Sequence, residues 1–414
     1  MKYSLKTALY MMSIFFIFQA CESETVEPED EITPLTTPPT YEFASRFVDG
    51  VSSVSYTGQV VRNVIIKDLK SLASNGTLAS DSSALTDLFN NGGASTATML
   101  NQGLQTQWSD FGNTSKLSNK IATDVLLGYD HTPTDQMMVW FSEVPALMSF
   151  SDGGSTRMIR ADSLELNQMI GKGLLGVVAY YQGTSVYMPK IDNDDNTMQD
   201  DGDPYTAMEH HWDESFGYFG AAIDYNTYEG GDDARKSSFD SNEDGFIDYK
   251  TEYNFGWATY AAKRDIDCAA TCTVDNDFTG TIMGAYLEGR TLIYNESPLA
   301  DIQAQRTIIV NAWEKLVVSN IIHYAKSVSD KIEAGNVSIL HAWAEMRAFA
   351  MALQYNQYKV IGDTALSEVI TMMGTVPPAL DSWTTYKETL TGTNGIVSKL
   401  QTAYSLDQNC VDSW

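Results

Sequence analysis

The hydrophobic positions of this chain recur mostly with the period of an α-helix. Residues 60–72 carry apolar side chains on one face, and the Asn75-Gly76 pair that follows favours the end of a helix. The longest stretch of this kind covers 299–332. Further helices are predicted over 84–89, 97–104, 136–150, 163–181, 206–220, 252–265, 277–294, 337–355, 364–373 and 396–404. The pattern indicates a mainly α protein of helical bundles packed side by side.

Alternation of apolar and polar residues, which is typical of strands, is nearly absent from the chain. A small hairpin over 52–59 is the one strand-like candidate.

The N-terminus has the pattern of a targeting signal. Lys2 and Lys6 precede an apolar run over 8–18 that is too short to span a bilayer comfortably. The ending Phe-Gln-Ala-Cys resembles a bacterial lipoprotein signal, in which Cys21 is lipidated and becomes the mature N-terminus. We therefore predict a signal peptide over 1–20 and an outer-membrane lipoprotein, with a soluble form cleaved nearby as the alternative.

The rest of the chain divides by composition. Residues 21–40 are rich in Glu, Pro and Thr and are predicted to be an acidic, flexible tether. Residues 41–414 are the predicted helical domain, for which a division into two lobes, about 41–235 and 236–414, is one option. The acidic residues after Cys21 resemble a surface-export signal, so both the periplasmic face of the outer membrane and the cell surface stay open.

Charge narrows the classes of partner. The 414 residues have a formal net charge of −28, while 43% of them are hydrophobic, as expected for a folded chain. Such a surface repels nucleic acid, because phosphate binding needs a basic footprint. An acidic surface favours cations instead.

The densest group of chemical side chains lies in the predicted helix over 206–220. His210 and His211 stand four and three residues before Glu214, so both can share that carboxylate on one helix face. The spacing His-x-Trp-x-Glu recurs at His341 and Glu345.

Imidazoles and carboxylates on rigid helices are suitable ligands for a transition metal. We predict a divalent metal site, of iron or zinc, in which His341 and Glu345 oppose the first set. Two other interpretations use the same residues. They are buried His–Glu hydrogen bonds that specify packing beside a core Trp, or general acid–base pairs.

A second cation candidate is the loop over 240–252. Oxygen-bearing side chains alternate along it, Gly245 stands at loop position 6, and the apolar Ile247 stands at position 8, as in an EF-hand calcium loop. The acid expected at position 12 comes one residue late. The predicted calcium ligands are Asp240, Asn242, Asp244, the Phe246 carbonyl, Asp248 and Glu252. A solvated acidic turn is the alternative.

Three cysteines remain once Cys21 is assigned to lipid. Export permits disulfides, and Cys268 and Cys272 are the expected pair because they close a short loop. Cys410 could instead take one of them. The chain has no Cys-x-x-Cys zinc pattern.

The stretches EHHWDESFGYFG at 209–220, DSNEDGFIDYKTEYNFG at 240–256 and AAKRD at 261–265 resemble an uncharacterised bacterial lipoprotein domain family. More distantly, they resemble the imelysin-like proteins, also called insulin-cleaving membrane proteases. Those are all-helical envelope proteins, often iron-regulated, with a Gly-x-His-x-x-Glu motif thought to bind metal. His211 and Glu214 match its His and Glu, whereas Glu209 replaces its Gly. The resemblance implies an imelysin-like fold of two packed helical bundles with long loops.

Together these patterns predict a cell-envelope lipoprotein that binds a divalent metal, with iron as the expected ion, or a metal-loaded ligand. The outer membrane would be reached through the lipid anchor, and an envelope or uptake partner is left unidentified. One alternative is a metallopeptidase, with zinc on the histidines and Glu214 or Glu345 as general base. The other is a non-catalytic partner-binding module. The chain has no His-Glu-x-x-His, Gly-x-Ser-x-Gly or phosphate-loop signature.

Overall fold

The computed structural model describes residues 34–75, 81–152, 155–268, 271–272, 274, 277–336 and 338–414. The signal peptide predicted over 1–20, the lipidation site Cys21 and most of the tether lie outside the described residues. Leu35–Trp414 forms one compact unit. None of the helices in the described part is both long and apolar enough to cross a membrane.

The protein is mainly α, as predicted, with 58% of the chain helical and a single two-stranded hairpin among the described residues. The helices are α1 (Thr57–Ser74), α2 (Ser83–Asn91), α3 (Pro133–Glu143), α4 (Leu166–Leu174), α5 (Ala207–Phe219), α6 (Gly231–Arg235), α7 (Gly256–Cys268), α8 (Phe278–Tyr294), α9 (Leu299–Glu333), α10 (Ile339–Ala350), α11 (Asp363–Met373), α12 (Trp383–Thr391), α13 (Ile396–Tyr404) and α14 (Gln408–Ser413).

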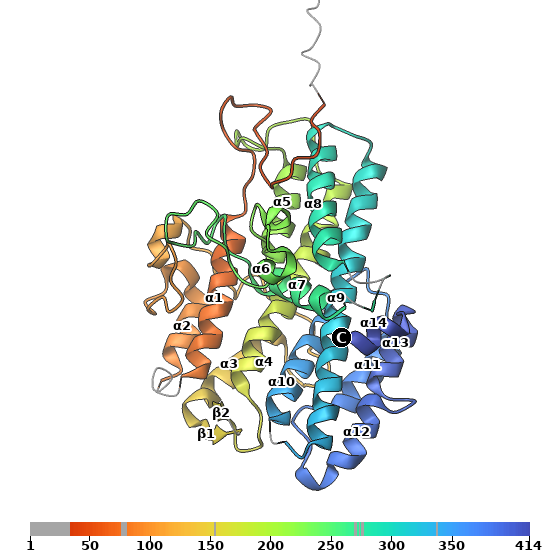
Figure 1. The fold of residues 1–414 in the computed structure, drawn as a ribbon. Helices are drawn as coiled ribbons and strands as arrows, with labels where there is room; N and C mark the ends of the chain where they lie inside the picture. Colours follow the sequence, from red (N-terminus) through yellow and green to blue (C-terminus); the bar gives the residue numbers. More distant parts are fainter. Residues whose placement is uncertain are drawn as a thin grey trace, which may run out of the picture. The chain divides into compact units, whose positions relative to one another are not determined.

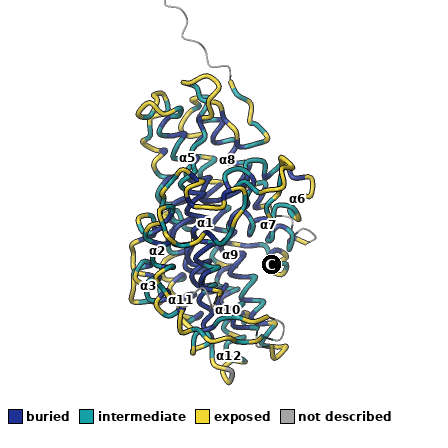
Figure 2. Tube along the Cα trace, turned by 90° about the vertical axis from the view of Figure 1, so that its left-hand side faces the viewer, coloured by how far each residue is buried: buried dark blue, intermediate teal, exposed yellow. Residues whose placement is uncertain are grey.

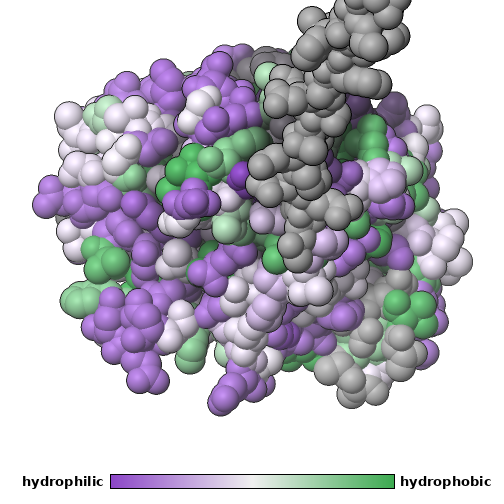
Figure 3. All heavy atoms as spheres, turned by 90° about the horizontal axis from the view of Figure 1, so that it is seen from above, coloured by the Kyte–Doolittle hydropathy of each residue, from purple (hydrophilic) through white to green (hydrophobic). Residues whose placement is uncertain are grey.

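The long helix α9 carries much of the packing in Leu35–Trp414. Its 35 residues span roughly 50 Å at 1.5 Å per residue. Helices α8 and α10 both pack on α9, and α1 and α10 pack on α4 (Figure 1). The buried residues gather along α1, α9 and α10, whereas the connecting loops are mostly exposed (Figure 2). In the view from above, hydrophilic residues predominate and hydrophobic ones are scattered among them (Figure 3).

Trp313 is the aromatic centre of this packing. Its ring meets those of Tyr180, Phe219 and Trp257 edge to face, with centroids 5.6, 5.3 and 6.1 Å apart. Such arrangements are favoured by the quadrupoles of the rings. Because the three partners come from the segment after α4, from α5 and from α7, one side chain of α9 fixes three elements.

Two predicted elements are wrong. Residues 52–59 do not form a hairpin, because α1 already begins at Thr57 and only one isolated bridge, Ala44 to Ser52, precedes it. No helix forms over 97–104. There the carboxylate of Asp68 accepts the backbone N–H groups of Leu100 and Asn101 at 2.8 and 2.9 Å, so a side chain replaces the helical hydrogen bonds.

The observed hairpin pairs β1 (Met148–Ser151) with β2 (Thr156–Ile159) in antiparallel register, Met148 opposite Ile159. The helix predicted over 136–150 is too long, because its last residues form the first strand of this hairpin. Helix α3 ends at Glu143, and Pro145 lies in the short 3-10 segment Val144–Ala146 before the strand. Since proline cannot donate a helical hydrogen bond, it separates the two elements.

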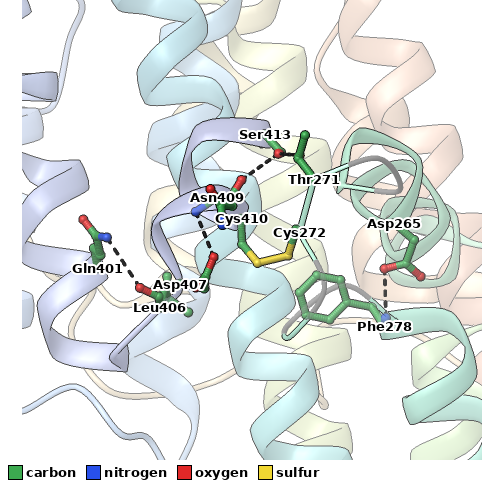
Figure 4. The surroundings of a disulfide bond; sticks show 10 residues. All are labelled: Asp265, Thr271, Cys272, Phe278, Gln401, Leu406, Asp407, Asn409, Cys410 and Ser413. Atoms are coloured by element: carbon green, nitrogen blue, oxygen red, sulfur yellow. Dashed lines mark hydrogen bonds between the residues drawn. A yellow bond between two sulfur atoms is a disulfide. The ribbon is translucent and has the colours of Figure 1, made fainter.

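The disulfide prediction is also wrong in its pairing. Cys272 bonds to Cys410, 138 residues later (Figure 4). Cys268 is buried and free. Cys268 ends α7, and the N–H of Cys272 donates to its carbonyl in a helical turn. The C-terminal helix α14 then presents Cys410 to Cys272. The alternative in which Cys410 takes one of the two cysteines is therefore the correct one.

We expect Cys410→Ser to lower the free energy of unfolding by about 2–5 kcal/mol, because the bridge closes a long loop of the unfolded chain. Denaturant midpoints without reductant measure the change. The matched control is Cys268→Ser, which leaves the bridge in place. A control that loses as much stability as Cys410→Ser would contradict the pairing.

Candidate functional site

Helix α5, which carries the first predicted ligand set, starts with a capping box. The hydroxyl of Thr206 accepts the N–H of Glu209 at 3.2 Å, and the Glu209 carboxylate accepts the N–H of Thr206 at 2.8 Å. Its Thr-x-x-Glu spacing is visible in the sequence. The helix ends at Gly220, whose φ of +78° lies in the left-handed region that favours glycine.

One face of α5 is fixed against α8 by Trp212. This fully buried indole donates to the Tyr286 carbonyl at 3.0 Å. It lies directly on Gly289, where an added Cβ would stand 2.0 Å from the ring. The close approach therefore requires glycine at position 289.

The same face carries a buried charge network centred on Arg290 of α8, which is 0% exposed. Its guanidinium donates to Asp213 at 3.0 Å, to Glu209 at 2.8 Å and to the Ser53 hydroxyl at 2.7 Å. Tyr41 adds a donor to Asp213 at 2.8 Å. Sequence reasoning missed this network. The sequence shows that Glu209 and Asp213 are four residues apart on one helix face, but this spacing does not identify Arg290 as their partner.

Burial raises the pKa of Asp213 to about 6, although the Arg290 charge opposes the rise. Arg290 lies beside both buried carboxylates, and Arg46 Nε lies 3.4 Å from Glu209 as a second cation. Asp213 therefore holds its proton more readily than an exposed acid does.

On the outer side of α5, His211 is already paired with protein groups. Its Nδ1 lies 2.7 Å from an Asp194 carboxylate oxygen, and its Nε2 lies 2.9 Å from Lys190 Nζ. An ammonium can only donate, so Nε2 accepts from Lys190 and Nδ1–H donates to Asp194. Both ring nitrogens are engaged.

His210 and Glu214 make a looser pair. The Nε2 of His210 is 4.0 Å from a Glu214 oxygen, and that oxygen also accepts the side-chain N–H of Gln59 at 2.7 Å. The His210 ring stacks on Tyr205, with centroids 4.6 Å apart. The first predicted set thus lies on one helix, as the spacing requires, with each member held by a different neighbour.

The second predicted set, on α10, belongs to an ion-pair network. His341 Nδ1 lies 2.8 Å from both Glu165 and Arg157, and its Nε2 lies 3.3 Å from Glu345. Glu345 also pairs with Lys172 at 2.5 Å. Burial would raise the pKa of Glu345, but the charges of Lys172 and His341 hold it below its ordinary value.

The structure does not bring the five predicted ligands together. Among the described residues, one group of three or more His, Cys, Asp or Glu has its donor atoms within 4.8 Å of one another, namely Cys268, Cys272 and Cys410. Two of those sulfurs form the disulfide. A site in which His341 and Glu345 oppose His210, His211 and Glu214 would need donor atoms at about that separation.

The loop over 240–252 has a defined conformation. Asp240 accepts the N–H groups of Asp244 and Gly245 at 3.2 and 2.8 Å, and Asn242 also accepts the N–H of Asp244, at 2.9 Å. Gly245 has φ +89°, which suits glycine. Three predicted oxygen ligands, on Asp240, Asn242 and Asp244, therefore belong to one tight turn.

Glu252 has a different role from the predicted one. One of its oxygens accepts the N–H groups of Ser241 and Asn242, both at 3.2 Å, and the other accepts the N–H of Asp248 at 2.9 Å. The Asp248 side chain accepts the amide of Gln105 at 2.8 Å. The Phe246 side chain is 56% exposed. Glu252, itself buried, ties the start of the loop to its end.

A family model described as a domain of unknown function (DUF4856) matches residues 145–376. The matched region includes both His–carboxylate sets, Arg290 with its partners Glu209 and Asp213, and the loop over 240–252. No curated protein and no solved structure matches the chain.

Replacing Arg290 by Met should lower the free energy of unfolding at pH 7 by about 3–5 kcal/mol, because it leaves Asp213 buried without its cation and leaves Glu209 with Arg46 at 3.4 Å. Denaturant midpoints measure the loss. Arg160→Met is the control: its partners Glu143 and Asp162 are partly exposed, and we expect less than about 1 kcal/mol.

The loss should be smaller at pH 5. The folded pKa of Asp213 lies above its unfolded value, so the stability that this group contributes is present at low pH and is lost as the pH rises through about 6. Without Arg290 the carboxyl holds its proton still more strongly. Equal losses at pH 5 and pH 7 would contradict this account.

Proposed function

The chain belongs to the family described as a domain of unknown function (DUF4856), and we propose that it is a cell-envelope lipoprotein whose helical domain binds a divalent cation. We place the cation in the loop over 240–252, with calcium as the ion. The envelope location rests on the lipoprotein-like signal that ends at Cys21.

The observation that carries the proposal is the turn in which side-chain oxygens of Asp240, Asn242 and Asp244 all accept backbone N–H groups. Two of these side chains accept the same N–H, that of Asp244, so their oxygens lie close together on one side of the backbone. Calcium takes carboxylate, amide and carbonyl oxygens in a flexible geometry, and water can complete its shell. The carbonyl of Phe246 follows in the same turn.

Glu252 supports the same site although it stands one residue late. By binding the N–H groups of Ser241, Asn242 and Asp248, it holds the loop closed from outside the ligand set. Preorganisation of this kind lowers the entropy that cation binding has to overcome.

A transition-metal site on α5 or α10 has weaker support. Iron or zinc on His211 would have to displace Lys190 or Asp194, and on His341 it would compete with Arg157, Glu165 and Glu345. The metallopeptidase alternative depends on the same nitrogens. We also propose an imelysin-like arrangement of two packed helical bundles and an uptake partner. Both rest on the resemblance around His211 and Glu214.

Calcium should raise the thermal midpoint of the protein relative to EDTA. A ligand at 100 times its Kd stabilises the folded state by about 2.7 kcal/mol, which corresponds to a shift of several degrees. Melting curves at constant ionic strength measure it. The double change Asp240→Asn with Asp244→Asn should abolish the shift.

The matched control is Asp233→Asn, which removes one exposed carboxylate from α6 and should keep the full shift. Equal midpoints in calcium and EDTA would refute the calcium site. A shift that survives in the double variant would place the cation elsewhere.

A further inference from the structure

Four lysines line one cleft in this strongly acidic protein. The cleft, of about 200 Å³, lies among α1, the α4 segment and the start of α7. Its charged lining residues are Lys67, Lys70, Lys172 and Lys263. The chain has 26 lysines and arginines against 54 acids, so a cluster of one positive sign runs against the composition of the whole.

Two helices present three of these lysines through the same spacing. From α1 the cleft takes Asn63, Ile66, Lys67 and Lys70, and from α7 it takes Gly256, Thr259, Tyr260 and Lys263. Each set follows the positions i, i+3, i+4 and i+7, which share one face of a helix. Both helices therefore turn a mixed polar and basic face to the cleft.

Most of this positive charge is not neutralised by a carboxylate. Lys172 pairs with Glu345 at 2.5 Å. Among the described residues, Lys67, Lys70 and Lys263 have no carboxylate oxygen within 4.0 Å. Glu345 and Glu165 act on Lys70 only from further away, and Glu165 itself pairs with Arg157 and His341.

Holding these ammonium groups together has a cost that an anion would remove. Burial, together with the charge of Lys172, lowers the pKa of Lys70 to about 7. Burial also lowers the pKa of Lys263, with Lys172 and Arg264 adding to the effect. A negative ligand would favour the charged form of both lysines.

The walls of the cleft suit a small organic molecule. The Nζ of Lys67 lies 4.4 Å from the centre of the Tyr253 ring, and that of Lys263 lies 4.9 Å from the centre of the Tyr260 ring. Leu175 adds an apolar surface. Gly171 leaves room for Lys70, since a Cβ there would stand 2.8 Å from the Lys70 Cδ.

We infer that this cleft binds a small organic anion with two or more negative charges, a polycarboxylate or a phosphate ester, through Lys67, Lys70 and Lys263. Lys172, fixed by Glu345 and by the Gln168 side chain, lines the back of the cleft. The site does not depend on the calcium loop.

Calorimetric titration of the full chain with citrate and with inorganic phosphate, at constant ionic strength and pH 7, tests the inference. We expect at least one of the two probes to bind at one site per chain. Binding of citrate alone assigns carboxylates, and binding of phosphate alone assigns phosphate esters. The blank is a titration of buffer into protein, in chloride buffer without sulfate. If neither probe gives binding heat above that of the blank, the inference is overturned.

Substitutions then locate the site. Lys70→Met and Lys263→Met keep the apolar stems and should each weaken binding at least tenfold, which is about 1.4 kcal/mol. Lys399→Met is the matched control, because it removes a charge from the partly exposed pair with Glu368 on α13 and α11, and it should bind as the wild type does. Equal weakening in all three variants would mean nonspecific attraction and would overturn the site.

A proton readout separates contact with Lys70 from a purely structural role. At pH 8 the titration, repeated in buffers of different ionisation enthalpy, should show proton uptake on binding, because the anion restores the charge of Lys70. Lys70→Met should lose most of that uptake even where residual binding remains. Unchanged uptake in this variant would exclude Lys70 as the contact.

Discussion

The pairing of Arg290 is the constraint on which the rest of this region depends. A fully buried guanidinium is tolerated only when its donors are satisfied, and here they reach Asp213 and Glu209 on α5 and Ser53 in the segment before α1. One side chain of α8 thereby fixes the register of α5 and the path of the chain that enters the domain. Glu209 serves twice, since it also closes the capping box of α5. The outward direction of His210 and His211 follows from how that inner face is held.

Two adjoining parts of the molecule carry opposite charge. The loop over 240–252 gathers carboxylates, whereas the cleft gathers lysines, and Tyr253 follows Glu252 directly in the chain. Because Glu252 ties the loop, it also sets where the backbone enters the wall of the cleft at Tyr253. A cation in the loop and an anion in the cleft would be bound by adjoining segments of one backbone.

The structural features that the sequence predicts correctly are those that depend on the spacing of nearby residues. Helical periodicity identifies the mainly α class, and the Thr206 and Glu209 pair identifies a helix start, because both are set within one or two turns. The pairing of Cys272 with Cys410 depends on where α14 docks, 138 residues away, and no local pattern contains that information. The same limit explains the missing helix over 97–104, where Asp68 of α1 supplies the acceptor from a distant turn.

The two His-x-Trp-x-Glu stretches show why equal spacing does not mean one site. On α5, His211 meets Asp194 and Lys190, and Glu214 meets Gln59. On α10, Glu345 turns instead to Lys172, so the stretch read from sequence as a metal ligand set forms the counter-charge of the lysine cleft. The spacing fixes which side chains share a helix face, but the elements packed on that face decide the chemistry. Here those elements are α4 with its lysine in one case and the acidic loop before α5 in the other.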